Sequence, residues 1–445
     1  MKYFLAIDIG ATSGRHIVGW FDESEGDFHP SKIKTEEVYR FPNGNKKVNG
    51  HLTWDIESLT ESVIEGTKKA LEKFPRIESM AIDTWGVDYV LIDKEGEAIL
   101  PCYAYRDSRT EEPIKRVHEI MPFAELYKRT GIQFQTFNTV YQLYDDMEKG
   151  RLEGAVDFLM MPEYLSYVLT GVKKKEYTNA TTGGFVNAET KEYDREIIKA
   201  LGLPERLFGE LSSPGETVGM LKDEIAARVG GQIKVVLCAT HDTGSAVEGI
   251  GLEGYGDVYV SSGTWSLLGV KSPEAHTDEK SMAANYSNEG GVGYVRYQKN
   301  IMGMWTVNNL WRELCPEKKI QEIEREARDS KLPLDAFVDI NHDDFLAPES
   351  MAFTFKKHLK GYTIETEQDY FRCAFNSLAE SYRVAVKDLE ANMGQPLDSI
   401  YIVGGGAKNK FLNELTEEAT GKKVIALPIE ATAIGNLAVQ IKAAL

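Results

Sequence analysis

Hydrophobic runs alternate with amphipathic segments along the first half of the chain. YFLAIDIG (3–10) predicts a buried strand that ends in glycine, and RHIVGWFD (15–22) predicts a second strand after a short turn. WDIESLTESVIEGTKKALEKF (54–74) has the spacing of a helix with one apolar side, and SMAIDTWGVDYVLID (79–93) predicts two short strands around residues 84–86. Strands that alternate with helices indicate an α/β fold.

The second half follows a similar order. DVYVSSGTWSLLGV (257–270) predicts a strand, a turn and a strand, and residues 368–394 predict a long helix. SIYIVGGGAKNKFLNELTEEATG (399–421) predicts a strand, a glycine loop and a helix. KVIALP (423–428) then predicts a strand, and residues 430–445 predict a terminal helix.

One coarse repeat organises these elements. LAIDIGATSGRHIVGWF (5–21) and VYVSSGTWSLLGV (258–270) are both strand–turn–strand units with small and hydroxyl residues at the bend. Each unit lies near the start of one half of the chain. We therefore expect two related α/β domains, residues 1–248 and 249–445, that flank a central cleft.

Composition narrows the class of protein. The 445 residues carry a formal net charge of −18, which argues against nucleic acid or an anionic membrane as the main partner. No apolar run approaches the ~18–20 residues of a membrane span, and the start MKYFLAIDIG lacks the pattern of a signal peptide. The four cysteines are far apart and form no CxxC motif, as is typical of reduced thiols in a cytoplasmic protein.

The first turn, Asp8 to Arg15, holds the residue types that a phosphate site needs. Glycine lets backbone N–H groups approach oxyanions, the hydroxyls of Thr12 and Ser13 donate hydrogen bonds, and Arg15 adds a cation. Asp8 at a strand end offers an oxygen ligand for Mg²⁺ through water. The segment is no Walker P-loop, because GxxxxGK[ST] is absent. An ordinary hairpin turn remains the alternative, and the similar turn Ser261-Ser262-Gly263-Thr264 favours the phosphate hypothesis.

Two glycine-rich segments have different interpretations. Gly249 to Gly254 match GxGxxG, but a helix is expected before them and a strand after them, which is the reverse of a dinucleotide site. We interpret them as a linker. Gly404-Gly405-Gly406 follow a predicted strand and open a helix, which fits either a tight turn or a nucleotide contact.

His241-Asp242 directly follow the apolar run Val235–Ala239. A metal site would need further ligands at recognisable spacing, and a Ser-His-Asp triad would need a sharp serine elbow; neither pattern is present. Two interpretations stay open at this point: a helix cap before SAVEG, or a catalytic base at a strand end.

Polar residues near Trp85 offer a further candidate site. Asp83 and Asp88 flank TWGV and could bind sugar hydroxyls beside the indole ring, or else Asp88 faces solvent and Trp85 belongs to the core. Residues 106–109 (RDSR) fit an ordinary cluster of surface ion pairs.

Taken together, the segments resemble the FGGY family of carbohydrate kinases over nearly the whole chain. Single pieces are weakly specific, whereas their ordered set is highly specific. The segments that carry the resemblance are DIGATSGR (8–15), IDTWGVDYVLID (82–93), AYRDSRT (104–110), TGIQFQTFNTVYQL (130–143), MPEYLSYVLTG (161–171), EYTNATT (176–182), THDTGSAV (240–247), SSGTWSLLGV (261–270), NEGG (288–291), KNIMGMW (299–305) and IVGGGAKN (402–409).

The resemblance implies two actin-like (ribonuclease-H-like) ATPase domains, with ATP and Mg²⁺ as cofactors. The implied reaction transfers the γ-phosphoryl of ATP to a ketose hydroxyl. IDTWGVDY and THDTGSAV favour L-rhamnulose as the ketose over L-fuculose, xylulose or glycerol. A catalytically silent actin-like sugar sensor is the alternative from another class, and no nucleic acid or membrane partner is expected. We expect a monomer or a weak homodimer.

The same resemblance assigns site residues. Asp242 is expected to accept the proton. The residues expected to contact the sugar are Asp83, Gly86, His241, Asp242, Thr243 and Asn300. The residues expected to contact ATP are Ala11, Thr12, Ser13, Gly14, Arg15, Thr264, Asn308 and Gly405. Asn308 stands where members of the family carry a glutamine, so its side chain is one methylene shorter. Members also continue several tens of residues past the last helix, so we expect a chain that is truncated or naturally short after Leu445.

Overall fold

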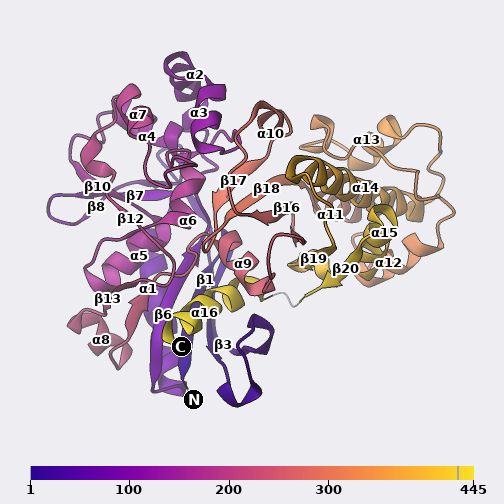
Figure 1. Ribbon diagram of the computed structural model, residues 1–445. Helices are drawn as coiled ribbons and strands as arrows, with labels where there is room; N and C mark the ends of the chain where they lie inside the picture. Colours follow the sequence, from indigo (N-terminus) through magenta and orange to yellow (C-terminus); the bar gives the residue numbers. More distant parts are fainter. Residues whose placement is uncertain (1, 428–429) are drawn as a thin grey trace. The chain divides into compact units, whose positions relative to one another are not determined.

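A computed structural model describes residues 2–427 and 430–445 (Figure 1). Contacts divide the chain into two units. Unit 1 consists of Met1–Leu252, Ser272–Tyr297 and Glu430–Leu445, and unit 2 consists of Glu253–Lys271 and Gln298–Ile429.

Unit 1 is built on a six-stranded sheet with the strand order β13-β14-β6-β1-β2-β3. Its strands are β1 (Tyr3–Ile9), β2 (Ser13–Trp20), β3 (Lys34–Pro42), β6 (Ile77–Thr84), β13 (Thr217–Met220) and β14 (Lys234–Val236). Strands β1, β2 and β3 are antiparallel, whereas β6 lies parallel to both β1 and β14. The predicted strand–turn–strand at the start of the chain is therefore confirmed as the β1–β2 hairpin.

Shorter strands and most of the helices complete unit 1. The other strands of this unit are β4 (Asn45–Val48), β5 (His51–Trp54), β7 (Tyr89–Asp93), β8 (Ala98–Ile99), β9 (Cys102–Tyr103), β10 (Ala155–Met160), β11 (Lys175–Glu176), β12 (Leu211–Ser212) and β17 (Ser287–Gly290). Its helices are α1 (Ile56–Lys73), α2 (Glu111–Ile120), α3 (Phe123–Thr130), α4 (Thr139–Glu148), α5 (Met161–Thr170), α6 (Tyr177–Ala180), α7 (Arg195–Ala200), α8 (Asp223–Val229), α9 (Asp242–Ile250), α10 (Glu279–Ala283) and α16 (Ala431–Ala444).

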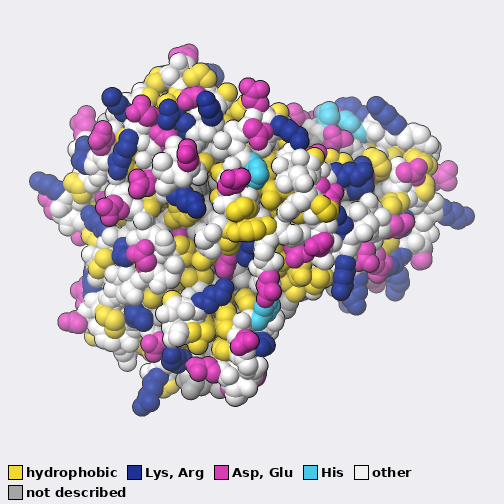
Figure 2. Space-filling model, viewed as in Figure 1, with side chains coloured by type: hydrophobic (Ala, Val, Ile, Leu, Met, Phe, Trp, Pro, Cys, Tyr) yellow, Lys and Arg dark blue, Asp and Glu magenta, His cyan; other side chains and the backbone are white. Residues whose placement is uncertain are grey.

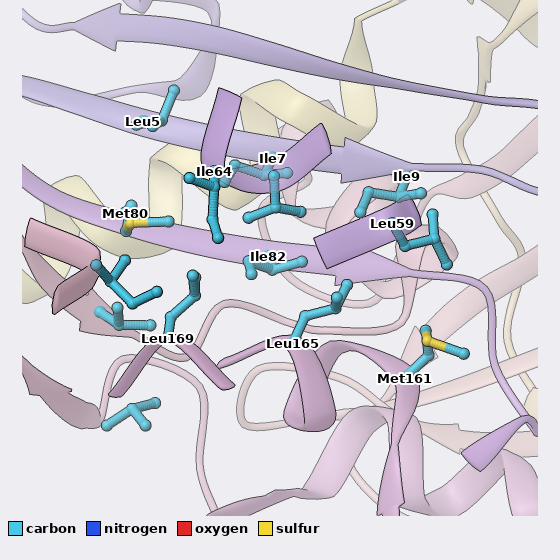
Figure 3. Close-up of a cluster of buried hydrophobic side chains, with 14 of the residues drawn as sticks. Leu5, Ile7, Ile9, Leu59, Ile64, Met80, Ile82, Met161, Leu165 and Leu169 are labelled. Atoms are coloured by element: carbon cyan, nitrogen blue, oxygen red, sulfur yellow. The ribbon is translucent and has the colours of Figure 1, made fainter. Parts of the chain in front are cut away.

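One large hydrophobic cluster of unit 1 lies between its sheet and helices α1 and α5. Figure 3 shows Leu5, Ile7 and Ile9 of β1 beside Met80 and Ile82 of β6, together with leucines of both helices. Burying one such aliphatic side chain stabilises a fold by roughly 1.5–3 kcal/mol. The helix predicted over residues 54–74 is confirmed as α1, and its buried residues are those of the expected apolar side.

Unit 2 repeats the pattern of the β1–β2 hairpin. The hairpin of β15 (Val258–Ser262) and β16 (Trp265–Ser272) is antiparallel, while β19 (Ser399–Val403) lies parallel to both β15 and β20 (Lys423–Ala426). The order β16-β15-β19-β20 thus matches β2-β1-β6-β14 of unit 1, which confirms the predicted duplication. The strand expected over residues 423–428 ends at Ala426, and Pro428 lies outside the described residues.

Helices cover the sheet of unit 2 (Figure 1). They are α11 (Trp305–Leu314), α12 (Ile320–Asp329), α13 (Met351–His358), α14 (Glu367–Met393) and α15 (Lys410–Thr420), and a further strand, β18 (Val295–Met302), begins in unit 1 and ends in unit 2. The long helix predicted over residues 368–394 is confirmed as α14, which ends at the left-handed Gly394.

The last helix belongs to unit 1, although it follows unit 2 in the sequence. Helix α16 packs against α9 and against β1, and both chain ends lie beside this sheet in Figure 1. All four cysteines, Cys102, Cys238, Cys315 and Cys373, are buried free thiols, as expected. In Figure 2, acidic and basic side chains are interspersed over the visible face.

Candidate active site

Three charged side chains lie side by side where β2, β1 and β6 pair. The register places Asp8 of β1 opposite Arg15 of β2 and opposite Asp83 of β6. Arg15 donates to Asp8 Oδ2 from Nε at 2.9 Å and from Nη2 at 2.8 Å. Because paired residues of neighbouring strands project from the same face, the sheet brings these distant residues together.

Asp83 is fully buried at the end of β6. Its Oδ2 accepts a hydrogen bond of 2.6 Å from Asn436 of α16, and its Oδ1 has no hydrogen-bond partner among the described residues. Burial raises the pKa of Asp83 well above its usual value, and the negative charges of Asp8 and Asp242 add to that effect against the Asn436 hydrogen bond. Asp83 is therefore a buried neighbour of two other carboxylates.

Asp242 is the first residue of helix α9. Its Oδ1 accepts from the N–H of Thr243 at 2.6 Å and lies 3.5 Å from His241 Nε2. Burial in the surrounding protein raises the pKa of Asp242 above 3.8 although 30% of the side chain is still exposed, and His241 opposes that rise. The N-cap position is His241, whose side chain makes no capping hydrogen bond. A partly exposed carboxylate at a helix N-terminus is thus available to a ligand.

A buried arginine organises the surroundings of His241. Arg296 of β18 is 0% exposed, and its Nη2 lies 3.1 Å from His241 Nδ1 and 3.1 Å from Glu289 Oε2. Its Nη1 donates to the hydroxyl of Thr243 at 2.9 Å, and its Nε donates to the carbonyl of Gly290 at 2.8 Å. Glu289 Oε2 itself lies 3.1 Å from His241 Nδ1.

Sequence reasoning missed both Arg296 and Glu289. The segment NEGG contributed to the family resemblance, but no local pattern marked these two residues as part of the site. The sequence offers one sign of them: Glu289 and Arg296 are the only charged residues in the segment 286–297. The fold, rather than sequence spacing, places them against His241 and Thr243.

The turn between β6 and β7 is held in a strained conformation. Val87 has φ +67, a left-handed value that β-branched residues rarely adopt. Its N–H donates to Thr182 Oγ1 at 3.0 Å, and its carbonyl accepts from Thr139 Oγ1 at 2.7 Å and from Gln142 Nε2 at 3.2 Å. These bonds fix the backbone next to Gly86, the predicted sugar contact.

The first hairpin turn is closed by backbone hydrogen bonds. The N–H of Gly10 donates to the carbonyl of Ser13 at 2.9 Å, and Asn43 bonds the carbonyls of Gly10 and Thr12 through its side chain and its N–H. Thr12 is exposed, and Ala11 and Ser13 are half-buried. The exposed tip of this turn therefore presents hydroxyls to solvent, as a phosphate contact requires.

The corresponding turn of unit 2 packs beside the glycine-rich loop. Gly404 has φ +84, and a Cβ there would lie 2.6 Å from the carbonyl oxygen of Ser262. Gly405 is exposed, with open space where a Cβ would point, and Thr264 is exposed at the tip of the hairpin. Thr264 and Gly405, two of the three predicted ATP contacts in this unit, thus have accessible surface.

Asn300 and Asn308 also belong to unit 2. Asn300 is exposed on β18, and Asn308 is half-buried on α11, where its N–H donates to the carbonyl of Met304 at 2.8 Å. The N–H of Met304 in turn donates to the carbonyl of Gly263 at 2.9 Å, which joins the start of α11 to the hairpin turn.

The structure excludes one of the open alternatives for Asp88 and corrects the expectation for Arg109. Asp88 does not face solvent: it is 0% exposed and accepts from the indoles of Trp54 and Trp85 at 2.6 and 2.9 Å, and burial raises its pKa to about 6. Arg109 is no surface residue, because its side chain is 2% exposed and bonds Asp145 and Asp146 at 3.0 and 2.7 Å. Both side chains are buried and hydrogen-bonded. A single sequence does not show whether a charged residue is buried in this way or exposed to solvent.

Among the described residues, one group of three possible metal ligands has its ligand atoms within 4.8 Å of one another, and it lies in unit 2. In unit 1, the carboxylates of Asp8, Asp83 and Asp242 offer oxygen ligands of the kind that Mg²⁺ takes. The group in unit 2 consists of His342, Asp344 and His358. There, however, Asp344 Oδ2 is already bonded to Lys357 Nζ at 2.6 Å and to His358 Nε2 at 2.7 Å.

Comparison with solved structures defines the class. The structure matches xylulose kinase from Lactobacillus acidophilus with a TM-score of 0.83 at 15% identity, covering 100% of this chain and 90% of that chain. It also matches Plasmodium falciparum glycerol kinase with ADP at a TM-score of 0.78 and 15% identity, covering 99% and 90%. The fold is that of the two-domain carbohydrate kinases.

Sequence comparisons identify the family. The model of the N-terminal domain of the FGGY family of carbohydrate kinases matches residues 3–249, and the model of its C-terminal domain matches residues 258–444. Rhamnulokinase from Oceanobacillus iheyensis is 40% identical over 449 residues, covering 99% of this chain and 93% of the relative. Rhamnulokinase from Bacillus subtilis is 38% identical over 452 residues, covering 99% and 90%. The chain belongs to the FGGY family of carbohydrate kinases.

As an additional structural finding, the described residues contain no helix that combines the length and the apolar character needed to cross a membrane.

Proposed function

We propose that the protein is an ATP-dependent rhamnulokinase. It transfers the γ-phosphoryl of ATP to the 1-hydroxyl of L-rhamnulose and yields L-rhamnulose 1-phosphate and ADP, in L-rhamnose catabolism. Relatives named rhamnulokinase, 37–41% identical over nearly the whole chain, support this substrate. The structural observation that carries the proposal is the carboxylate of Asp242, which is partly exposed at the start of α9 beside His241.

Asp242 acts as the proton acceptor in this proposal. A sugar hydroxyl must lose its proton as its bond to phosphorus forms, and a carboxylate within about 3 Å can accept that proton. The carboxylate keeps an open surface, and its raised pKa makes it a stronger base than an ordinary aspartate. The hydrogen bond from the N–H of Thr243 fixes the other side of the group.

The sugar is bound by Asp83, Gly86, His241, Asp242, Thr243 and Asn300 in this proposal. The support differs between residues. His241 and Thr243 are oriented by Arg296, which suits groups that must hold hydroxyls in one geometry. Asp83 is 0% exposed beside Asp8 and Asp242, so its proposed sugar contact has the least direct support of the six. Asn300 is exposed on β18, where its amide is free to meet a ligand.

ATP is held by residues of both hairpin turns. The proposed contacts are Ala11, Thr12, Ser13, Gly14 and Arg15 in the first turn and Thr264, Asn308 and Gly405 in unit 2. Hydroxyls and backbone N–H groups at glycine-containing turns suit phosphate oxygens. We assign residues 1–248 to sugar binding and the first phosphate turn, and residues 249–445 to nucleotide binding.

Mg²⁺ fits the donor set of the site. Asp83 Oδ1 is a buried oxygen without a hydrogen-bond partner among the described residues, and Asp8 lies beside it on β1. Because Asp8 is also paired with Arg15, we assign it to Mg²⁺ through water. The ion would neutralise charge on the phosphate oxygens. Arg15 supplies a fixed positive charge in the same place.

The proposal also covers the partners of the enzyme, its compartment and its oligomeric state. Its partners are a small ketose and ATP, with no nucleic acid or membrane, and it works in the cytoplasm as a monomer or weak homodimer. The net charge of −18 supports the absence of a nucleic acid partner.

A panel of acceptors tests the proposal. ADP release is measured with L-rhamnulose, L-fuculose, D-xylulose and glycerol at fixed ATP and Mg²⁺. We expect kcat/KM for L-rhamnulose to exceed that for each other acceptor by at least about tenfold, because one misplaced hydroxyl or methyl group costs that much in a shaped pocket. A higher kcat/KM for another acceptor would replace L-rhamnulose as the substrate, and no turnover of any acceptor would refute the kinase activity.

A further inference from the structure

Glu176 is a buried carboxylate that accepts hydrogen bonds from five donors. It lies at the end of β11 and is 0% exposed. Its Oε1 accepts from the N–H of Thr178 at 2.7 Å. Its Oε2 accepts from the hydroxyls of Thr178 and Thr240, both at 2.6 Å, and from the N–H groups of Asn179 and Thr240, both at 3.1 Å. Such a set of donors lets a carboxylate remain buried without a cation.

The carbonyl group of Thr240 is hydrogen-bonded as well. It accepts from the N–H of Thr84 at 2.9 Å and from Asn179 Nδ2 at 3.3 Å. Thr240 is 2% exposed, and it directly precedes His241 and Asp242. Its N–H, hydroxyl and carbonyl are therefore all fixed, the first two by Glu176.

A second arm of the same network reaches His241. The hydroxyl of Thr178 donates to Glu176 Oε2 and accepts from the N–H of His241 at 3.5 Å. His241 is also paired with Thr84 across an isolated bridge between the two segments. We call Glu176, Thr178 and Thr240 the Glu176 clamp. The clamp determines where the chain leaves the buried run before α9.

The position of this backbone matters because proton transfer requires short distances. A displacement of about 1 Å at a reacting group can cost on the order of 100-fold in rate. Asp242 is two residues from Thr240 and begins α9, so any shift at Thr240 moves the carboxylate directly. Glu176 caps the N-terminus of α6 through the N–H groups of Thr178 and Asn179, but that role does not require its two hydrogen bonds from Thr240. The mechanism proposed above leaves those two bonds without a role.

We propose that Glu176 is a positioning residue for phosphoryl transfer: through Thr240 and Thr178 it fixes the backbone that aims Asp242 at the sugar hydroxyl. This inference rests on the proposed function, since it assigns Asp242 as the proton acceptor. Glu176 itself contacts neither substrate.

The test uses three variants and one matched control in the full-length protein. Thr240→Val removes one hydroxyl at constant size, Thr240→Ser restores that hydroxyl, and Glu176→Gln removes the charge. The control is Thr67→Val, which deletes an equally buried hydroxyl whose hydrogen bond goes to the carbonyl of Val63 within α1. Steady-state kcat and ketose KM are measured for each variant, with the folded fraction taken from circular dichroism.

The clamp predicts a separation of kcat from KM. Thr240→Val is expected to lower kcat about tenfold with ketose KM changed by less than about twofold, and Glu176→Gln to lower kcat about 100-fold. Thr240→Ser should stay within about twofold of wild type, and so should Thr67→Val. The double variant Glu176→Gln/Thr240→Val should lose no more kcat than Glu176→Gln alone, because both changes remove one shared interaction.

Two results would overturn the inference. One is that Thr240→Val and Thr67→Val have the same kcat per folded molecule. This comparison does not need the Glu176→Gln variant, so it can be made even if that variant fails to fold. The other is a double variant whose losses are additive. A wild-type protein that phosphorylates no ketose would instead refute the proposed function, and this inference with it, so the wild type is measured first.

Discussion

At the scale of single residues, burial decides what each polar side chain does. His16 is 0% exposed on β2, and burial lowers its pKa to about 4, while its Nε2 lies 3.1 Å from the carbonyl of Val63. Asp242 instead lies beside the charged or polar groups of His241 and Arg296, and 30% of its side chain is exposed. His16 is therefore a neutral histidine of the core, whereas the carboxylate of Asp242 is accessible for proton exchange with a ligand.

His16 makes the protein sensitive to acid. Its pKa is about 4 when folded and 6.5 in its ordinary state, so below pH 6.5 the unfolded chain binds a proton that the folded chain refuses. Stability falls as the pH drops from 6.5 to 4, by about 3 kcal/mol in total from this group. His16→Gln should remove this part of the pH dependence, measured as the free energy of unfolding in urea at pH 7 and pH 5. An unchanged difference between the two pH values would show that His16 does not contribute.

Arg296 offers a second prediction at this scale. A lysine at this position keeps one positive charge but loses the fork that reaches Thr243, His241 and Glu289 together. Arg296→Lys should raise ketose KM about tenfold, because both proposed sugar contacts lose their orientation. Arg40→Lys is the control, since Arg40 forms an exposed pair with Glu37. Equal KM values for the two variants would contradict the role of Arg296.

At the scale of elements, the crossing of α9 and α16 positions the start of α9. The two helices approach so closely that a Cβ at Gly435 would lie 1.7 Å from the carbonyl oxygen of Ser245. Asn436 and Gln440 of α16 also bond the backbones of β6 and β1, through Ala81 and Leu5. Helix α16 thus connects the sheet that bears Asp8 and Asp83 with the helix that bears Asp242.

Gly435→Ala tests this crossing because two effects oppose each other. Helix propensity alone predicts a gain of up to ~1 kcal/mol, whereas overpacking against Ser245 predicts a loss of about 3 kcal/mol. We expect the loss, seen as a lower midpoint of urea unfolding. Gly44→Ala serves as the control, because nothing lies within 4 Å of a Cβ there, and should change stability by less than about 0.5 kcal/mol. A stabilised Gly435→Ala variant would show that the helices are not so close.

Some helices and strands could be predicted from the sequence, whereas the place of others in the fold could not. The hairpins β1–β2 and β15–β16 and the helices α1 and α14 follow from local periodicity, because each buries one side of its own sequence pattern. The place of α16 in unit 1 does not follow, since its apolar pattern fits any buried partner and the preceding strand belongs to unit 2. Arg296 and Glu289 were missed for a related reason: long-range packing, rather than spacing, places them against His241.

At the scale of the whole molecule, the same strand order occurs once in each unit. Both units carry a hairpin followed by parallel strands, and each hairpin presents an exposed threonine at its turn, Thr12 or Thr264. The match to solved kinases at 15% identity and a TM-score of 0.83 indicates that this fold depends on buried patterns more than on particular residues.

The central claim is that Asp242 accepts the proton of the sugar hydroxyl, and Asp242→Asn tests it most directly. The variant keeps the shape of the side chain and the hydrogen bond from Thr243, so it should fold and bind the ketose as wild type does, measured by calorimetry. Its kcat should fall by roughly 100- to 10,000-fold, the range typical of a lost general base. Turnover close to that of the wild type, with sugar binding intact, would contradict the account.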